Sequence, residues 1–167
     1  LPWPRAVTIA HAVATALYEA HTVAILHRDL KAENVILAAS GEIKVLDFGL
    51  AKDLVAHDAQ ETLSHTQGLA GTPRCMSPEQ AMSMPLDRRS DLFSFGVLLY
   101  ELLTGTSPFA GPTVMATLYN LCSVRQISVA QLDPSVPRQL SQLVDDLLEK
   151  DPERRPDDAQ EVVARLE

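Results

Sequence analysis

The amino-acid sequence predicts a mainly α-helical fold that carries one small β-hairpin. The prediction rests on two apolar segments, at residues 5–24 and 90–105, and on two short β-type runs, at residues 35–38 and 43–46. The chain has 167 residues, of which 46% are hydrophobic. This length and composition are typical of a single domain with a true core.

The first expected helix covers residues 5–24. Prolines at positions 2 and 4 suit a helix start, because the first turn leaves its N–H groups unpaired in any case. The apolar side chains recur every three or four residues, which places them on one face of a helix. They are Ile9, Val13, Ala16, Leu17 and Ala20. We therefore expect a core helix.

A β-hairpin is expected at residues 35–46, with Gly41 in its turn. Asn34 directly precedes the first strand, and Asp47 directly follows the second. Because the two strands are antiparallel, both side chains should emerge at the same end of the hairpin. That arrangement suits two ligands of one cation.

The remaining segments alternate between loop and helix. Residues 50–70 are polar and without a clear period, which predicts a mobile loop. Residues 90–105 are apolar on most sides, which predicts a buried helix with Ser90 as its N-cap and Gly105 as its stop. Three further helices are expected, at residues 114–124, 137–148 and 157–166.

Charge, hydropathy and cysteine content narrow the class of protein. The net charge of -8 argues against a nucleic-acid-binding surface and favours neither an anionic membrane nor a polyanionic partner. No apolar run approaches the length of a transmembrane helix, and no signal peptide is predicted. Cys75 and Cys122 lack metal-type spacing, so free thiols in a reducing cytosol are expected, with a disulfide as the alternative. The expected location is the cytoplasm.

Three motifs follow one another along the chain. They are His27-Arg28-Asp29-Leu30-Lys31-Ala32-Glu33-Asn34, Asp47-Phe48-Gly49, and Gly71-Thr72-Pro73-Arg74-Cys75-Met76-Ser77-Pro78-Glu79. They match the catalytic loop, the D-F-G element and the G-T-P-x-Y-M-x-P-E segment of protein kinases. Three motifs in this order are far more specific than any one tripeptide. The chain thus resembles the C-terminal lobe of a protein Ser/Thr kinase of the Hanks type found in bacteria, from about Pro4 to its last residue.

The resemblance implies transfer of the γ-phosphoryl group of ATP, as co-substrate, to a Ser or Thr hydroxyl of a protein. Asp29 would accept the proton of the attacking hydroxyl, and Lys31 would contact the γ-phosphate. Asn34 and Asp47 would bind Mg²⁺ or Mn²⁺ through hard oxygen atoms. The expected nucleotide-binding residues are Lys31, Glu33, Asn34, Ile36 and Asp47. Without the motif, a loop-capping Asp and a solvated Lys would be the ordinary interpretations.

The resemblance also implies a phosphorylation switch. Arg28, together with Lys52, would pair with a phosphorylated residue and order the activation segment. The candidate sites are Thr62, Ser64 and Thr66, with Thr66 preferred. The alternative is that these hydroxyls are ordinary loop residues. Thr72 would reach the catalytic Asp and Lys and help to position the substrate.

Five further residues are expected to support the site rather than to react. His27 and Phe48 would stack in the core. Asp91 would accept backbone N–H groups of the catalytic loop, and as a helix-start acid it would also favour the helix dipole. Glu79 and Arg155 would form a partly buried, bidentate ion pair.

The chain also departs from the family pattern. It contains no Gly-rich loop, no third-strand Lys with its Glu partner and no adenine hinge, so residues 1–167 are expected to be a C-terminal lobe whose N-terminal lobe is missing. Such a lobe would bind ATP poorly and would expose apolar surface at residues 35–37. Cys75 stands where Tyr is usual, and Ser77 stands where Ala is usual, which leaves the substrate preference open.

Two functions remain possible on the sequence. In the first, the chain is the catalytic lobe of an active Ser/Thr kinase whose partners are ATP, a protein substrate and the N-terminal lobe. In the second, it is a non-catalytic kinase-like lobe that binds other proteins. The intact set of Asp29, Lys31, Asn34 and Asp47 favours the first, because a lobe without catalysis has no physical need of it.

Overall fold

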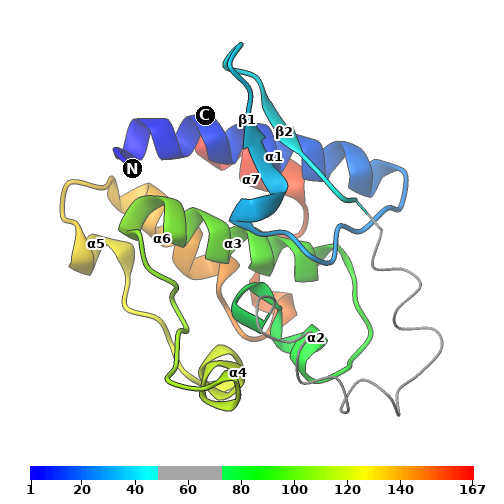
Figure 1. Cartoon of the computed structure of the whole chain (residues 1–167), viewed down its shortest axis with the longest axis vertical. Coiled ribbons are helices and arrows are strands. Elements are labelled where there is room, and N and C mark those ends of the chain that lie inside the picture. Colours follow the sequence, from blue (N-terminus) through cyan, green and yellow to red (C-terminus); the bar gives the residue numbers. More distant parts are fainter. Residues whose placement is uncertain (49–72) are drawn as a thin grey trace.

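The computed structural model describes residues 1–48 and 73–167 and is built from helices with one two-stranded sheet (Figure 1). The predicted mainly helical fold is confirmed. The α-helices are α1 (Trp3–Thr22), α2 (Pro78–Ala81), α3 (Arg88–Thr104), α4 (Val114–Ser123), α5 (Val129–Leu132), α6 (Arg138–Leu147) and α7 (Ala159–Leu166). Short 3₁₀ helices are η1 (Ala32–Asn34), η3 (Pro73–Cys75) and η4 (Pro152–Arg154). The strands are β1 (Val35–Leu37) and β2 (Ile43–Val45).

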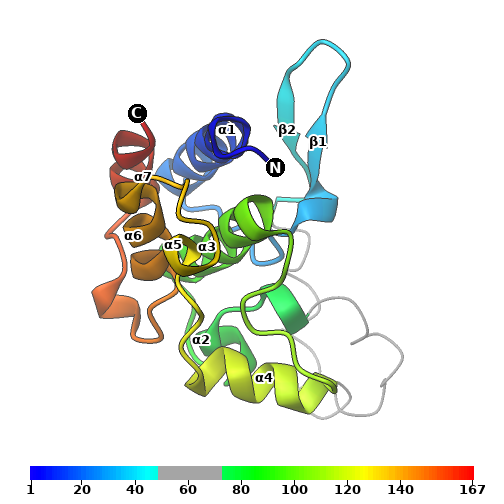
Figure 2. The same ribbon diagram turned by 90° about the vertical axis from the view of Figure 1, so that its left-hand side faces the viewer.

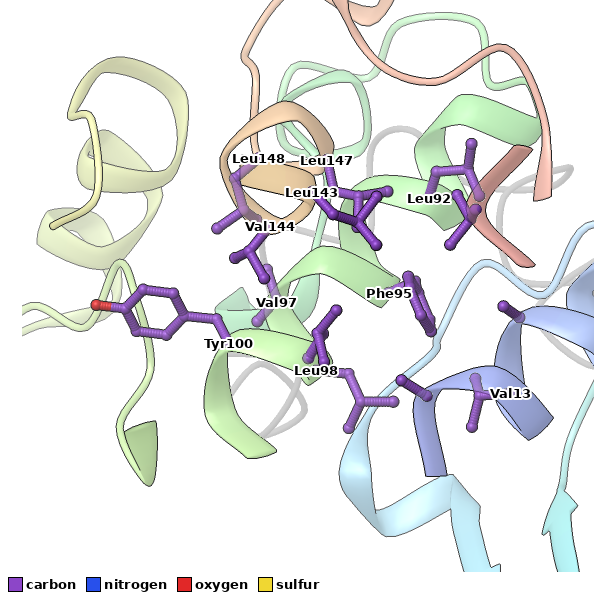
Figure 3. Close-up of a cluster of buried hydrophobic side chains, with 14 of the residues drawn as sticks. Val13, Leu92, Phe95, Val97, Leu98, Tyr100, Leu143, Val144, Leu147 and Leu148 are labelled. Carbon is purple, nitrogen blue, oxygen red and sulfur yellow. The ribbon is translucent and has the colours of Figure 1, made fainter. Parts of the chain in front are cut away.

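Helix α3 runs through the centre of the core, as its apolar sequence predicts. Figure 3 shows its side chains between α1 and α6, with Phe95 toward Val13 and Val97 toward Val144. Gly96 allows a close approach to α6, because a Cβ atom there would lie 2.7 Å from the Cβ of Leu147. A side chain at this position would therefore push the two helices apart.

The ends of α3 agree only in part with the sequence-based expectation. Gly105 ends the helix in the left-handed conformation, with φ 74°, as predicted. The N-cap is Asp87 and not Ser90, since the Asp87 side chain accepts the N–H of Arg89. Ser90 lies inside the first turn, where it is buried and its hydroxyl donates to Glu79.

Helix α1 packs on α3 and α7, and β2 lies against it. Its buried face is formed by Ala6, Ile9, Ala10, Val13, Ala14 and Leu17. Ala16 and Ala20, which we expected on this face, are only half-buried at its margin. The helix ends at Thr22, and the chain then turns into the loop that leads to the hairpin.

The predicted hairpin is present and projects from the helical body (Figure 2). Its strands are antiparallel with Val35 opposite Val45, and Gly41 turns the chain with φ 86°. The N–H of Leu46 donates to the carbonyl of Asn34 at 2.8 Å. This bond brings Asn34 and Asp47 to the same end of the hairpin, as expected.

The helices predicted at residues 114–124, 137–148 and 157–166 are present with slightly narrower bounds. The single-turn helices α2 and α5 were not predicted. Each has a Ser-x-x-Gln capping pattern, in which the Gln oxygen accepts the N–H of the Ser three residues before it. Within residues 1–48 and 73–167, none of the helices combines the length and apolarity that a membrane span requires.

Candidate active site

The loop between α1 and β1 brings the two expected catalytic side chains together. Lys31 Nζ donates to Asp29 Oδ2 at 2.6 Å, and the side chains are 21% and 32% exposed. The hydrogen bond to Asp29 raises the pKa of Lys31, against the effect of its burial. The other carboxylate oxygen, Asp29 Oδ1, is buried and has no hydrogen-bond partner in the described part of the chain. The carboxylate therefore keeps one unused acceptor.

Asp91 in the first turn of α3 fixes the backbone of this loop. Its Oδ2 accepts the N–H of His27 at 2.8 Å, and its Oδ1 accepts the N–H of Arg28 at 2.8 Å. Asp91 is 2% exposed, so these charge-assisted bonds lie in the interior. The contacts match the expectation from the sequence.

His21 joins the same carboxylate and was not predicted. Its Nε2 lies 2.9 Å from Asp91 Oδ2, and its side chain is 6% exposed. His21 lies in the last turn of α1, six residues before His27. The sequence does contain a signal for this contact, because His21 is a polar residue at the end of an otherwise apolar helix face.

The backbone at Arg28 adopts a conformation that non-glycine residues rarely take. Its φ is 69°, in the left-handed region, which costs about 1–2 kcal/mol for an L-residue. The carbonyl of Arg28 accepts a hydrogen bond of 2.6 Å from Nε2 of Gln80, another residue that was not predicted. The loop is therefore held from α3 at the N–H of Arg28 and from α2 at its carbonyl.

Asn34 and Asp47 present oxygen atoms beside this loop. Asn34 is buried, and its Nδ2 donates to the carbonyl of Asp29 at 2.8 Å, which leaves the amide oxygen for another ligand. Asp47 is exposed and has φ 63°. Residues 1–48 and 73–167 hold no cluster of three or more His, Cys, Asp or Glu suited to a metal ion. Two oxygen ligands fit Mg²⁺, which usually completes its shell with phosphate and water.

His27 links the loop to the end of β2. It is fully buried, and its Nε2 lies 2.9 Å from the carbonyl of Leu46, while its Nδ1 accepts the N–H of Asp29 at 3.3 Å. These two partners select the tautomer with the proton on Nε2. The His27 and Phe48 rings are in contact, with centroids 4.7 Å apart, but they are tilted by 56° and not stacked in parallel.

Glu79 and Arg155 form the expected bidentate pair away from the loop. The two N–O distances are 2.7 and 3.0 Å, and the side chains are only 6% and 0% exposed, so the pair is more buried than expected. Burial opposes the charge of Glu79, but the hydrogen bonds and charge of Arg155 outweigh it and lower the pKa of Glu79. The guanidinium group also donates to the carbonyls of Arg89, Glu149 and Lys150, so that all five of its N–H groups are used.

Cys75 ends η3, which packs against α3. The hydroxyl of Ser94 donates to its carbonyl at 2.7 Å. Burial raises the pKa of Cys75 to about 12, which keeps the thiol protonated and weakly reactive. Cys75 and Cys122 are both free thiols, as predicted.

The other predicted residues are either peripheral or outside the described part. Glu33 and Ile36 are exposed and flank Asn34. Gly49, Lys52, Thr62, Ser64, Thr66, Gly71 and Thr72, with the loop predicted at residues 50–70, lie outside the described residues.

Comparison with known proteins gives consistent matches over the whole chain. A family model described as the protein kinase domain matches residues 3–165. The chain is 36% identical over 167 residues to a probable serine/threonine-protein kinase of Clostridium perfringens and 40% identical over 171 residues to a serine/threonine-protein kinase of Myxococcus xanthus. These alignments cover 100% and 99% of this chain, but 24% and 20% of the relatives. The chain thus spans less than a quarter of the length of these curated relatives.

Proposed function

The chain belongs to the protein kinase family, and from this membership we propose that it is the C-terminal lobe of a serine/threonine protein kinase. The proposed reaction transfers the γ-phosphoryl group of ATP to a Ser or Thr hydroxyl of a protein. The observation that carries the proposal is the Asp29–Lys31 pair, which is anchored by its backbone and keeps one carboxylate oxygen unused.

In this proposal Asp29 orients the attacking hydroxyl and accepts its proton. A buried acceptor without a partner costs free energy, and a substrate hydroxyl at Oδ1 would satisfy it. Asp91 and Gln80 hold the preceding backbone, so the carboxylate needs little reorganisation when the substrate binds.

Lys31 supplies the positive charge. Its raised pKa keeps the amine cationic at neutral pH, and the 2.6 Å contact holds it beside Asp29. We assign it to the γ-phosphate, where a fixed cation stabilises the charge that develops during transfer.

Asn34 and Asp47 are assigned to a Mg²⁺ or Mn²⁺ ion. The hydrogen bond from Asn34 to the carbonyl of Asp29 turns the amide oxygen away from that bond, and the exposed Asp47 supplies a carboxylate at the same end of the hairpin. When bound, such an ion would neutralise negative charge on the phosphate groups, and the oxygen atoms of Asn34 and Asp47 would hold it. Glu33 is assigned to the nucleotide on its position alone.

Exposed apolar residues on the hairpin favour the proposal that a second lobe covers it. Ile36, Leu37 and Leu46 are 45%, 49% and 39% exposed, an apolar surface at the base and along the projecting strands. We propose that ATP lies against Ile36 and that an N-terminal lobe covers this surface, because apolar surface of this kind is stabilised by burial.

Regulation and location remain proposals from the sequence. We propose that phosphorylation of the loop, preferably at Thr66, with Thr62 and Ser64 as alternatives, engages Arg28 and Lys52. Thr72 is assigned to substrate positioning. The two free thiols agree with a reducing cytoplasm, where ATP is available.

The proposal is tested by joining the chain to the N-terminal lobe of a bacterial relative and measuring transfer of labelled phosphate to protein Ser and Thr. We expect activity in the joined protein and a loss of about 100-fold or more in Asp29→Asn. Calorimetry with Mg²⁺-ATP, with Asp47→Ala as the control, reports binding separately. A joined protein that folds and binds ATP but transfers no phosphate would favour the alternative, a protein-binding lobe without catalysis.

A further inference from the structure

Gln80 uses both ends of its side-chain amide to join two segments of the site. Its Nε2 donates to the carbonyl of Arg28 at 2.6 Å, and its Oε1 accepts the N–H of Ser77 at 2.9 Å. A backbone N–H only donates and a carbonyl only accepts, so the two partners fix the orientation of the amide. A carboxylate at this position would retain the Ser77 contact but would have no proton for Arg28.

The bond from Gln80 acts on the peptide group that leads into Asp29. The carbonyl of Arg28 and the N–H of Asp29 belong to one planar unit, so holding the carbonyl also fixes the direction of the N–H. That N–H points to His27 Nδ1. Since Arg28 has φ 69°, this unit lies in a conformation that its surroundings must enforce.

Gln80 is itself held on a rigid base. The neighbouring Glu79 is locked by Arg155, and Ser77 is fully buried. The hydroxyl of Ser94 in α3 holds the carbonyl of Cys75 just before them. The segment at residues 73–81 is therefore anchored to α3 and to Arg155, independently of the catalytic loop.

We propose that Gln80 is a positioning residue for phosphoryl transfer: its amide aligns the catalytic loop, and thereby the Asp29 carboxylate, with the segment at residues 73–81. This rests on the proposed function. The competing explanation is that Gln80 only caps α2, because Gln is a usual partner of Ser in a capping box.

The substitution Gln80→Glu separates these two roles. Glu caps as well as Gln, but when ionised it does not donate to the Arg28 carbonyl. The chain offers a matched control in Gln131→Glu. Gln131 is exposed and caps α5 in the same way, through an oxygen that accepts the N–H of Ser128 at 3.3 Å.

The first readout is amide hydrogen exchange of the chain itself. We expect Q80E to speed the exchange of Arg28 and Asp29 about 10-fold or more, relative to both wild type and Q131E. Exchange at these two amides that matches Q131E would overturn the proposal. This readout is independent of whether the chain catalyses phosphoryl transfer.

The second readout is kinetic and uses the joined kinase. We expect Q80E to lower kcat by about 10- to 100-fold, with KM for ATP within twofold of wild type and Q131E unchanged. Lowering the pH should raise the ratio of Q80E to wild-type kcat, because the introduced carboxyl group regains a proton to donate. A flat ratio, or a kcat equal to that of Q131E, would overturn the proposal.

Folding is monitored by the thermal midpoint of each variant. If Q80E unfolds at the assay temperature, Gln80→Met replaces it, since Met has similar length and carries no donor. Its kcat should fall by a similar factor, and a wild-type kcat would overturn the proposal. If the joined wild-type kinase transfers no phosphate, the proposed function fails, and hydrogen exchange still decides whether Gln80 holds the loop.

Discussion

Two carboxylate–cation pairs of the described residues differ sharply, Glu79–Arg155 in the interior and Asp29–Lys31 at the candidate site. In the first, the carboxylate is held by two guanidinium bonds, and every N–H of the cation is used. In the second, one bond of 2.6 Å joins the groups, and Asp29 Oδ1 has no partner within the described ranges. The interior pair is closed to other ligands, whereas the site pair keeps capacity for one.

The choice of cation accounts for much of this difference. Arg155 has a planar group whose five donors match a carboxylate and several carbonyls at once. Lys31 has a compact charge on a flexible chain and is 21% exposed, so it can move from Asp29 to a ligand. Pairs of similar charge thus differ in their capacity for other ligands according to how completely their hydrogen bonds are used within the chain.

The largest effect on stability is expected from breaking the buried Glu79–Arg155 pair. Glu79→Gln should lower the free energy of unfolding by about 3–5 kcal/mol, because it leaves Arg155 buried without a counter-charge. Urea denaturation of the chain measures this change. The control is Glu153→Gln, because Glu153 lies 2.6 Å from Arg89, a contact about as short as that of Glu79 with Arg155, but its side chain is 77% exposed. We expect the control to cost less than about 1 kcal/mol, and an equal loss in both variants would contradict the comparison.

The substitution Glu79→Gln should also change how the stability of the chain depends on pH. The pKa of Glu79 is lower in the folded chain than its ordinary value of 4.5, so the pair contributes its full stability above that value. The contribution is lost as the pH falls through the folded pKa. Wild type should therefore lose stability more steeply than Glu79→Gln as the pH falls below 4.5. Parallel curves of unfolding free energy against pH would contradict a stabilising role of the pair.

Lys150 is a third cation, and its nearest described partner is an aromatic ring and not a carboxylate. Lys150 Nζ is buried without a hydrogen-bond partner among the residues described, and it lies 3.5 Å from the centroid of the Phe109 ring. Burial lowers the pKa of Lys150 to about 8. We expect Lys150→Met to raise the free energy of unfolding at pH 7 by about 1 kcal/mol, after allowing for partial solvent screening and for the attraction of the ring.

The pH dependence of Lys150 has the same sign as that of Glu79 but lies in an alkaline window, because the pKa of both groups is lowered in the folded chain. Between the folded pKa of about 8 and the ordinary value of 10.5, the unfolded chain binds more protons, so stability rises with pH. Thermal midpoints at pH 7 and 9.5 should show this rise in wild type and a smaller one in Lys150→Met. A variant that is less stable than wild type at pH 7 would mean that the ring contact outweighs the burial of the charge.

The smallest effect on stability is expected at the Asp29–Lys31 pair. Asp29→Asn should change the free energy of unfolding by less than about 1 kcal/mol, because the pair is partly exposed and one oxygen is already unpartnered. Urea denaturation beside Glu79→Gln gives the comparison directly. A loss as large as that of Glu79→Gln would show that Asp29 is mainly structural.

The sequence predicted the parts of the fold that follow from local pattern. The periodicity of α1 and α3, the turn at Gly41 and the motif that carries Asp29, Lys31 and Asn34 all lie within short segments. The Glu79–Arg155 contact was predictable only because a family resemblance connects residues that lie 76 positions apart.

The contacts that were missed join side chains to distant partners. Gln80 and the Arg28 carbonyl lie 52 residues apart, and His21 and Asp91 lie 70 residues apart, so no local period indicates them. The N-cap of α3 was predicted at Ser90, but Asp87 is an equally good capping residue by type, and only the helix geometry selects it. The helices α2 and α5 could have been predicted, because each begins with a Ser-x-x-Gln capping pattern that is visible in the sequence.

The long separation between Glu79 and Arg155 sets an order of events during synthesis. At about 5–20 residues per second, a ribosome adds Arg155 about 4–15 s after Glu79. Throughout that interval the carboxylate of Glu79 has no guanidinium partner, and the segment that carries Gln80 lacks its contact with Arg155. The loop at residues 27–34 is thus translated well before Arg155, so the contacts that hold it through Gln80 reach their final form only after residue 155 has been made.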